Sequence, residues 1–182
     1  MKMKNNKKVR IGCASAFWGD TSTAAKQLVD KGDLDYLVFD FLAEVTMSIL
    51  ARAKLKDSEK GFAGDFLTQI EPLLPTIKQN GIKILTNAGG INPISCRTML
   101  KKAAKKRGID LNIGIVTGDD LLPELPKIKK LGVTELDTGN PFPKSCLSIN
   151  AYLGASGLVA ALDKGADTVS YTHLRAHETS EY

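Results

Sequence analysis

The chain has 182 residues, of which 43% are hydrophobic and 25% charged, with a formal net charge of +5. This length suits one domain with its own core, and the composition excludes disordered, fibrous and disulfide-stapled proteins. Three scattered cysteines without a C-x-x-C pair argue against a thiolate metal cluster and favour a reducing compartment. No apolar run approaches the roughly 18 residues of a membrane helix, and Arg10 interrupts the segment that would form a signal peptide. We therefore expect a cytoplasmic protein without a membrane partner.

Basic residues gather in two segments, 1–8 and 101–108. We expect the first to be a disordered N-terminus. The second is expected to lie on an amphipathic helix with four lysines outward and four apolar residues inward: Lys101, Lys102, Lys105 and Lys106 against Met99, Leu100, Ala103 and Ala104. No recognition motif accompanies this charge, so we expect no nucleic-acid partner.

Segments typical of strands and helices alternate from residue 9 onward. Apolar runs typical of buried parallel strands lie at 9–16, 35–42, 82–90 and 111–120, and 133–137 is a weaker fifth candidate. Helical spacing is found at 22–32, 44–57, 65–81, 92–108, 121–132 and 158–165. Pro72 and Pro75 are expected to break or kink the third helix, while Asn92 and Pro93 are expected to cap and begin the fourth.

This alternation predicts an α/β fold, because the strands are too far apart in sequence to form hairpins. We expect a mostly parallel sheet flanked by helices. Five or six strands are fewer than the eight of a closed barrel, which favours an open doubly wound sheet over a partial barrel. Ligands of such sheets bind at the carboxyl ends of the strands, so the loops that follow the strands are the candidate site.

The loop after the first predicted strand, "GCASAFWGD", is rich in small residues. Gly12, Ser15 and Gly19 would let backbone N–H groups approach an anion near the next helix. Neither a dinucleotide nor a Walker fingerprint is present, and a tight turn is the alternative.

The loop after the third predicted strand, "TNAGGINP", is the better candidate cradle for a phosphate or carboxylate. Asn87 and Asn92 offer amides, Gly89 and Gly90 lack side chains, and a helix N-terminus follows. An ordinary strand-to-helix turn with an asparagine cap is equally compatible with these residues.

Carboxylates follow two other predicted strands. Asp119 and Asp120 are adjacent in "TGDDL", and Glu44 lies beyond the second strand. Such groups hold Mg²⁺ or divide into a general acid and a general base, although helix capping and solvation explain a pair equally well. Asp40 also follows the second strand, and its position alone suggests a ribose contact. Asn150, in "SINAYLGASG", is expected to face the same crevice.

The C-terminal segment "VSYTHLRAHETSEY" contains both histidines of the chain, His173 and His177. Their spacing of four is typical of a metal site. However, "VSYTHLRAHET" also resembles an in-frame translation of the adapter used in transposon-based DNA sequencing libraries. We therefore expect residues 169–182 to be non-native, the histidines to form no metal site, and 9–168 to be a domain that is incomplete at its C-terminal end.

Five segments, in order, resemble the N-terminal domain of the acyclic terpene utilisation protein AtuA family: "RIGCASAFWGD", "GDLDYLVFD", "ILTNAGGINP", "GDDL" and "SINAYLGA". In that family the helix ending in "GAD" leads to a strand closing in Thr-Gly-Arg, which is absent here. The resemblance implies a catabolic protein that acts in acyclic terpenoid breakdown through branched acyl-CoA intermediates. It implies no assigned reaction, catalytic residue or cofactor.

The functional hypothesis is an enzyme that takes a small-molecule substrate such as an acyl-CoA. The two glycine loops would bind an anionic group, and Asp119, Asp120 and Glu44 would supply acid–base or metal-holding carboxylates for hydration, isomerisation or lyase-type cleavage. We expect a homo-oligomer. The alternative is a non-catalytic ligand-binding or assembly subunit with the same fold.

Overall fold

Five parallel strands form one open sheet in the computed structural model, which describes residues 8–42 and 44–172. The strands are β1 (Ile11–Cys13), β2 (Tyr36–Phe39), β3 (Lys83–Thr86), β4 (Ile113–Ile115) and β5 (Thr168–Ser170). They lie in the order β1-β2-β3-β5-β4, and every neighbouring pair is parallel. The predicted α/β fold with an open parallel sheet is therefore confirmed.

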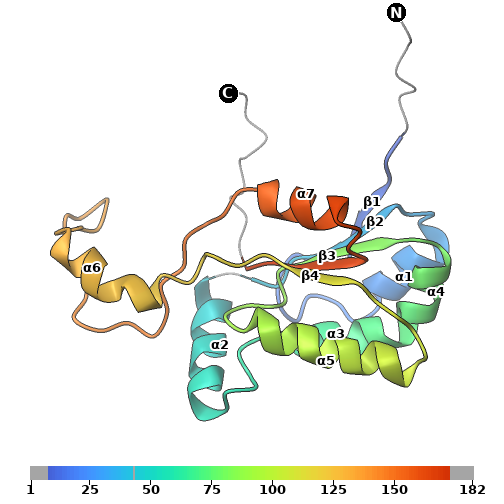
Figure 1. The fold of residues 1–182 in the computed structure, drawn as a ribbon, viewed down its shortest axis with the longest axis horizontal. Helices are drawn as coiled ribbons and strands as arrows, with labels where there is room; N and C mark the ends of the chain where they lie inside the picture. Colours follow the sequence, from blue (N-terminus) through green and yellow to red (C-terminus); the bar gives the residue numbers. More distant parts are fainter. Residues whose placement is uncertain (1–7, 43, 173–182) are drawn as a thin grey trace, which may run out of the picture.

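Helices cover the two faces of the sheet unequally (Figure 1). One face packs against α1 (Ala24–Lys31), α2 (Glu44–Lys56), α3 (Asp65–Ile70), α4 (Leu74–Gln79) and α5 (Pro93–Lys106), and the other carries α7 (Ser156–Asp163). The strand order explains this division. Connections from β1 to β4 advance across the sheet, whereas the connection from β4 to β5 returns, and right-handed crossovers then place its helix on the opposite face.

The main core lies between the sheet and the α1–α5 layer. Alternate residues of the central strands point into it, so Leu37, Phe39 and Ile84 are fully buried while their sequence neighbours are half-buried. Phe39 packs edge-on against Phe66 of α3, with 5.2 Å between ring centroids. This alternation fixes which polar residues emerge at the ends of the strands.

Prolines shape the helical layer as predicted. The third predicted helix is broken into α3, a 3-10 turn η1 (Glu71–Leu73) and α4, with Pro72 and Pro75 in the first turns of the second and third pieces. Helix α5 begins at Pro93 and is capped by Asn92, whose side chain accepts a hydrogen bond from Ser95 N–H. A second 3-10 turn, η2 (Leu122–Glu124), leads into the short helix α6 (Leu125–Lys130), which projects from the body (Figure 1).

The fifth strand lies elsewhere than predicted. Residues 133–137 form no strand, although Thr134 makes an isolated β-bridge to Pro141. Leu136 is 95% exposed, so its side chain has no apolar face against which to pack. The central strand β5 forms instead at residues 168–170, which include the first two residues of the segment expected to be non-native, and it places Val169 between Leu85 and Gly114. His173 and His177 lie outside the described residues.

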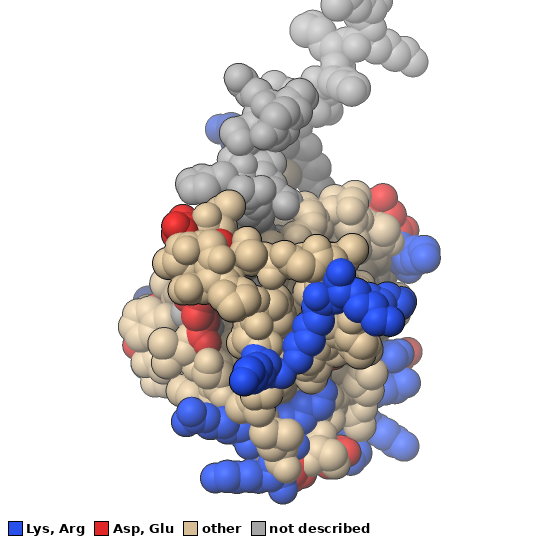
Figure 2. Space-filling model, turned by 90° about the vertical axis from the view of Figure 1, so that its left-hand side faces the viewer, with Lys and Arg blue, Asp and Glu red and all other residues tan. Residues whose placement is uncertain are grey.

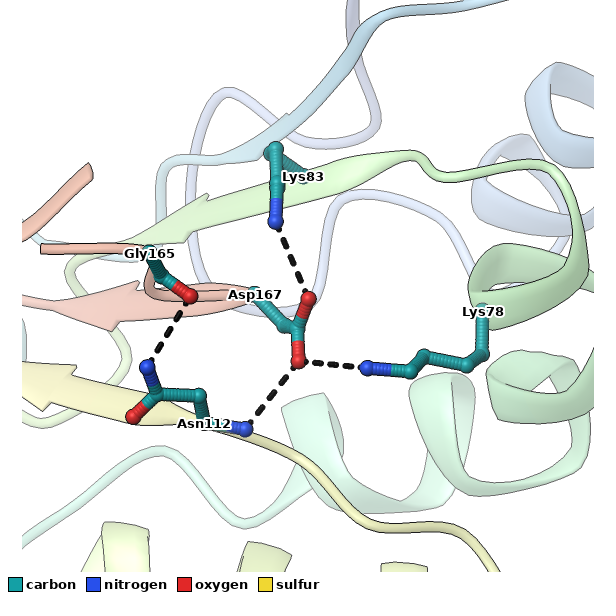
Figure 3. Close-up of polar contacts among 5 residues, drawn as sticks. All are labelled: Lys78, Lys83, Asn112, Gly165 and Asp167. Carbon is teal, nitrogen blue, oxygen red and sulfur yellow. Dashed lines mark hydrogen bonds and ion pairs between the residues drawn. The ribbon is translucent and has the colours of Figure 1, made fainter. Parts of the chain in front are cut away.

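Asp167 ties the start of β5 to both of its neighbours (Figure 3). Its carboxylate accepts hydrogen bonds from Lys78 Nζ at 2.7 Å, Lys83 Nζ at 3.0 Å and Asn112 N–H at 3.1 Å. Burial disfavours the charged form, but the bonds from Lys78, the Asn112 N–H and Lys83 outweigh it and lower the pKa of Asp167 from 3.8 to about 2. The ionised carboxylate is therefore the form that the folded state stabilises.

The first prediction concerns Asp167. Because its pKa is lower in the folded state, its contribution is complete above about pH 4 and is lost as the pH falls toward about 2. Asp167→Asn should lower the free energy of unfolding by about 1–3 kcal/mol at pH 7. Urea unfolding at several pH values measures this, and the variant and parent curves should converge near pH 2. A constant difference across that range would contradict the assignment.

The second prediction concerns two hydroxyls of β5. Thr168 Oγ1 and Ser170 Oγ are buried and have no hydrogen-bond partner among the described residues. An unsatisfied buried hydroxyl costs roughly 1–3 kcal/mol, so Thr168→Val and Ser170→Ala should each raise the free energy of unfolding by about 1 kcal/mol. Chemical denaturation tests this, and destabilisation by both substitutions would show that the hydroxyls have partners.

Candidate functional site

Three polar residues lie side by side at the carboxyl ends of β1, β2 and β3. The parallel ladder continues past the strands, because Asp40 N–H donates to Ser15 O at 3.2 Å and Asn87 N–H to Phe39 O at 3.4 Å. Ser15, Asp40 and Asn87 therefore share one pleat on the side of the sheet away from the main core, and we call them the carboxyl-edge row. Two of them, Ser15 and Asn87, were predicted site residues.

Hydrogen bonds fix the geometry of the carboxyl-edge row. Asn87 Nδ2 donates to Asp40 Oδ1 at 2.6 Å, and Asn87 Oδ1 accepts from Phe41 N–H at 2.7 Å. Asp40 is exposed, whereas Ser15 is 4% exposed and its Oγ has no partner among the described residues. The row thus presents an oriented carboxylate beside an unsatisfied hydroxyl, an arrangement that favours a hydrogen-bond donor over a phosphate.

Tyr171 extends this row, since its N–H donates to Thr86 O at 3.0 Å. Burial raises the pKa of Tyr171 to about 12, and the negative charge of the nearby Asp40 acts in the same direction. The phenol is therefore neutral at physiological pH and does not act as a base.

The glycine loop at 87–92 is closely packed against its own chain. The N–H groups of Gly90, Ile91 and Asn92 donate to Asn87 O, Gly61 O and Gly89 O at 2.9–3.1 Å. These donors are already used, so an anion at this loop would have to displace protein hydrogen bonds.

Both glycines of that loop are required by close contacts. Gly90 has φ of 53°, and a Cβ there would lie 2.8 Å from Gly61 O and against Leu50. A Cβ at Gly89 would lie 2.5 Å from Ser170 Oγ. Internal packing therefore accounts for both glycines without a ligand.

Asn92 is a structural hub between α5 and the loop after α2. Besides capping α5, its Nδ2 donates to Ser58 O at 2.8 Å and to Lys60 O at 2.7 Å. With 8% of its surface exposed and both ends of the amide engaged, Asn92 has little capacity left for a ligand.

The two predicted glycines of the first loop have different settings. Gly12 lies within β1 and is buried, and a Cβ there would approach Leu34 Cδ1 to 2.8 Å. Gly19 has φ of 90° in an open turn, which Asp20 stabilises by accepting a hydrogen bond from Ala16 N–H at 2.9 Å. Only Gly19 of this pair lies in the loop itself.

The adjacent carboxylates after β4 have different environments. Asp119 is 5% exposed, and its Oδ2 accepts a hydrogen bond from Asn150 Nδ2 at 2.9 Å. Asp120 is exposed, and its Oδ1 accepts from Leu122 N–H at 3.0 Å. A backbone bridge between Asp120 and Asn150 holds the two loop segments together. The structure thus joins three predicted site residues that are about thirty positions apart in sequence.

Two neighbouring cavities connect this cluster to α2. Asp120 and Asn150 line one of about 300 Å³, and Glu44 lines the other of about 200 Å³, together with Asn150. Asn150 and Ser148 belong to both. Glu44 and Asp120 therefore border neighbouring cavities that have Asn150 in common.

The larger cavity is mainly apolar and was not predicted. Its apolar lining consists of Ala51, Leu55, Ile91, Leu122 and Leu147. Lys54 also borders it and donates from Nζ to Ile91 O at 2.8 Å. No motif marks these residues, because they come from four separate segments that only the fold assembles.

The cysteines offer one accessible thiol near this edge. Cys13 is exposed, and its Sγ donates to Ser15 O at 3.1 Å. Burial raises the pKa of the Cys96 thiol to about 12, which makes Cys96 unreactive.

Within the described part of the chain, no group of three or more His, Cys, Asp or Glu residues could hold a metal ion. Over the same residues, no helix is both long and apolar enough to cross a bilayer.

The structural role of Asn92 leads to a third prediction. Asn92→Ala removes a helix cap and two buried hydrogen bonds, so it should lower the free energy of unfolding by about 2–3 kcal/mol. The exposed Asn80, at the end of α4, is the matched control, and Asn80→Ala should change stability by less than about 0.5 kcal/mol. Equal effects in thermal or urea unfolding would leave Asn92 free to act as a ligand contact.

Comparison with known proteins gives one clear result. No curated protein and no solved structure matches this chain. The sequence profile described as acyclic terpene utilisation family protein AtuA matches residues 9–170. That match spans every strand of the sheet and all the predicted site residues. The chain therefore belongs to the acyclic terpene utilisation AtuA family.

Proposed function

We propose that this protein is a catabolic enzyme that binds an acyclic terpenoid acyl-CoA, with the acyl chain in the cavity of about 300 Å³ between α2 and residues 120–150. That cavity is the observation that carries the proposal. Ligand sites of this size are usually apolar with a few polar groups at one side, and acyclic terpenes are apolar branched chains. Family membership supports the same substrate class.

The chemistry would take place where the cavity meets the carboxylates. Asp120 and Asn150 border the apolar lining, and Asp119 holds the Asn150 amide in place. Hydration, isomerisation and cleavage next to a thioester all require one group to accept a proton and another to donate one. Asp120 and Glu44 line the two cavities and Asp119 contacts Asn150, which lines both, so the unequal burial of these carboxylates would divide the acid and base roles.

Lys54 is the cation that borders this cavity, and we assign it to the thioester carbonyl. A positive charge beside that oxygen stabilises the negative charge that develops when a neighbouring proton is removed. The N–H groups of Gly90, Ile91 and Asn92 already have protein acceptors, so Lys54 is the better-placed partner for developing negative charge.

The nucleotide end of the thioester would lie outside the cavity. Figure 2 shows the molecule from the α2–α6 side, where lysine and arginine side chains are more frequent than carboxylates. Such a surface attracts the phosphates of coenzyme A, and this attraction weakens with salt.

A non-catalytic ligand-binding or assembly subunit is the alternative function. The exposed segment around α6 favours it, because Leu131 and Leu136 are 77% and 95% exposed and would suit a protein contact. The two functions differ in whether bound acyl-CoA is converted.

The fourth prediction tests the proposed function. Calorimetric titration should show binding of geranoyl-CoA but much weaker binding of acetyl-CoA, because the latter leaves the apolar cavity empty. Mass spectrometry of the mixture should then show a product: a gain of water for hydration, smaller fragments for cleavage, or a new chromatographic peak of equal mass for isomerisation. Binding without any product would support the alternative, and equal affinities would contradict the cavity assignment.

Substitutions of the carboxylates test their catalytic roles in the same assay. Asp119→Asn and Asp120→Asn should each lower turnover at least about 100-fold while leaving the unfolding transition close to that of the parent. Asp163→Asn, an exposed carboxylate at the end of α7, is the matched control and should retain full activity. Retained activity in both the Asp119 and the Asp120 variant would end this assignment.

A further inference from the structure

Another concave surface, formed by the helical layer, shares no lining residue with the proposed acyl cavity. It is a groove of about 550 Å³ between α3–η1 and α5. Besides Thr68, its lining consists of four apolar residues, which we call the floor, and four charged residues, which we call the rim: Leu67, Pro72, Met99 and Ala103, and Glu71, Lys102, Lys106 and Arg107. We call it the α5 groove.

The floor of the α5 groove departs from the amphipathic pattern expected for α5. Leu100 and Ala104 are buried as predicted, but Met99 is 42% exposed. The flexible thioether of a methionine adapts to varied apolar partners. The apolar face of α5 is therefore wider than the core that it covers.

The rim already shows affinity for a carboxylate. Glu71 Oε1 lies 3.6 Å from Lys106 Nζ and 3.5 Å from Arg107 Nε. Lys102 has no ion-pair partner among the described residues. Three cations against one carboxylate leave the groove positively charged, so an acidic occupant is electrostatically favoured.

We propose that the α5 groove docks an acidic amphipathic helix of a partner protein. From Met99 to Arg107 the groove follows α5 for about 12 Å, at 1.5 Å per residue, which matches two turns of a docked helix. Apolar residues at positions i, i+4 and i+7 would contact the floor, and flanking glutamates would reach Lys102 and Lys106.

Charge disfavours the two other kinds of occupant. A second copy of this chain carries a net charge of +5, so self-association through a positive groove is opposed by repulsion. Nucleic acid would be drawn to the lysines, but the floor offers aliphatic side chains and a thioether rather than the aromatic surfaces on which bases stack.

The fifth prediction is tested with a synthetic peptide as the probe. The peptide is a fluorescently labelled helix with leucines at i, i+4 and i+7 and glutamates beside them, and a control peptide carries lysines in place of the glutamates. Fluorescence anisotropy should show that the acidic peptide binds the protein and the lysine control peptide does not. The affinity of the acidic peptide should fall as the salt concentration is raised.

Matched variants of α5 test whether the acidic peptide binds in the α5 groove. Lys102→Glu breaks no ion pair and should weaken binding about tenfold, whereas Lys101→Glu, one residue away and outside the groove, should weaken it less than about threefold. Met99→Gln should also weaken binding, in contrast to Ile94→Gln, which changes an exposed apolar residue of α5 outside the groove.

Three results would overturn the proposal. Equal losses in the Lys102 and Lys101 variants would show nonspecific charge attraction, and no binding of the acidic peptide would show that the groove is not a helix site. Self-association of the protein that Lys102→Glu abolishes, measured by sedimentation velocity, would identify a second copy as the occupant. Turnover of geranoyl-CoA is a separate readout, so failure of either proposal is distinguishable from failure of the other.

Discussion

The pairing of β5 with both β3 and β4 is the contact on which the rest of the molecule depends. Strand β4 reaches the sheet through β5, so the loop that carries Asp119 and Asp120 is positioned by this short strand. The Asp167 carboxylate anchors the start of β5 by ion pairs and a main-chain hydrogen bond. Parallel pairing uses main-chain groups, which nearly any residue supplies, so β5 forms although two of its buried hydroxyls have no partner in the described part of the chain.

The fold produces two groups of polar residues, which differ in how many of their hydrogen-bonding groups are paired within the protein. Around Gly90 and Asn92, almost every donor and acceptor is used by the protein itself, which indicates a rigid structural joint between α2 and α5. Around Asp120 and Asn150, carboxylate and amide groups border apolar cavities instead. Buried groups with complete hydrogen bonding stabilise a fold, whereas polar groups at the edge of an apolar cavity orient a ligand. This contrast is why we propose the second group as the functional site.

Local patterns in the sequence were sufficient for elements whose signals are strong and short in range. The apolar runs of β2 and β3, the prolines that divide the third helix and the Asn92–Pro93 start of α5 all have local physical causes. Residues 133–137 have the composition of a strand but no apolar surface to cover, which only the fold reveals. The sequence indicates Asp40 only weakly, because its contact with Asn87 joins two neighbouring strands. The apolar cavity was not predicted, because its apolar lining comes from four separate segments. In sequence, Gly89 and Gly90 fit a ligand cradle and an ordinary turn equally well, because a close approach of the protein's own atoms requires the same small residues.

Hydrogen–deuterium exchange with and without geranoyl-CoA tests most directly whether the region between α2 and residues 120–150 is the binding site. We predict that the ligand slows amide exchange at 50–55, 120–122 and 147–150, and that exchange along α5 at 99–107 stays unchanged. Protection confined to 87–92 would instead identify the glycine loop as the ligand-binding site. Absence of protection at 120–122 and 147–150 in the presence of saturating ligand would contradict the assignment of the cavity as an acyl-chain site.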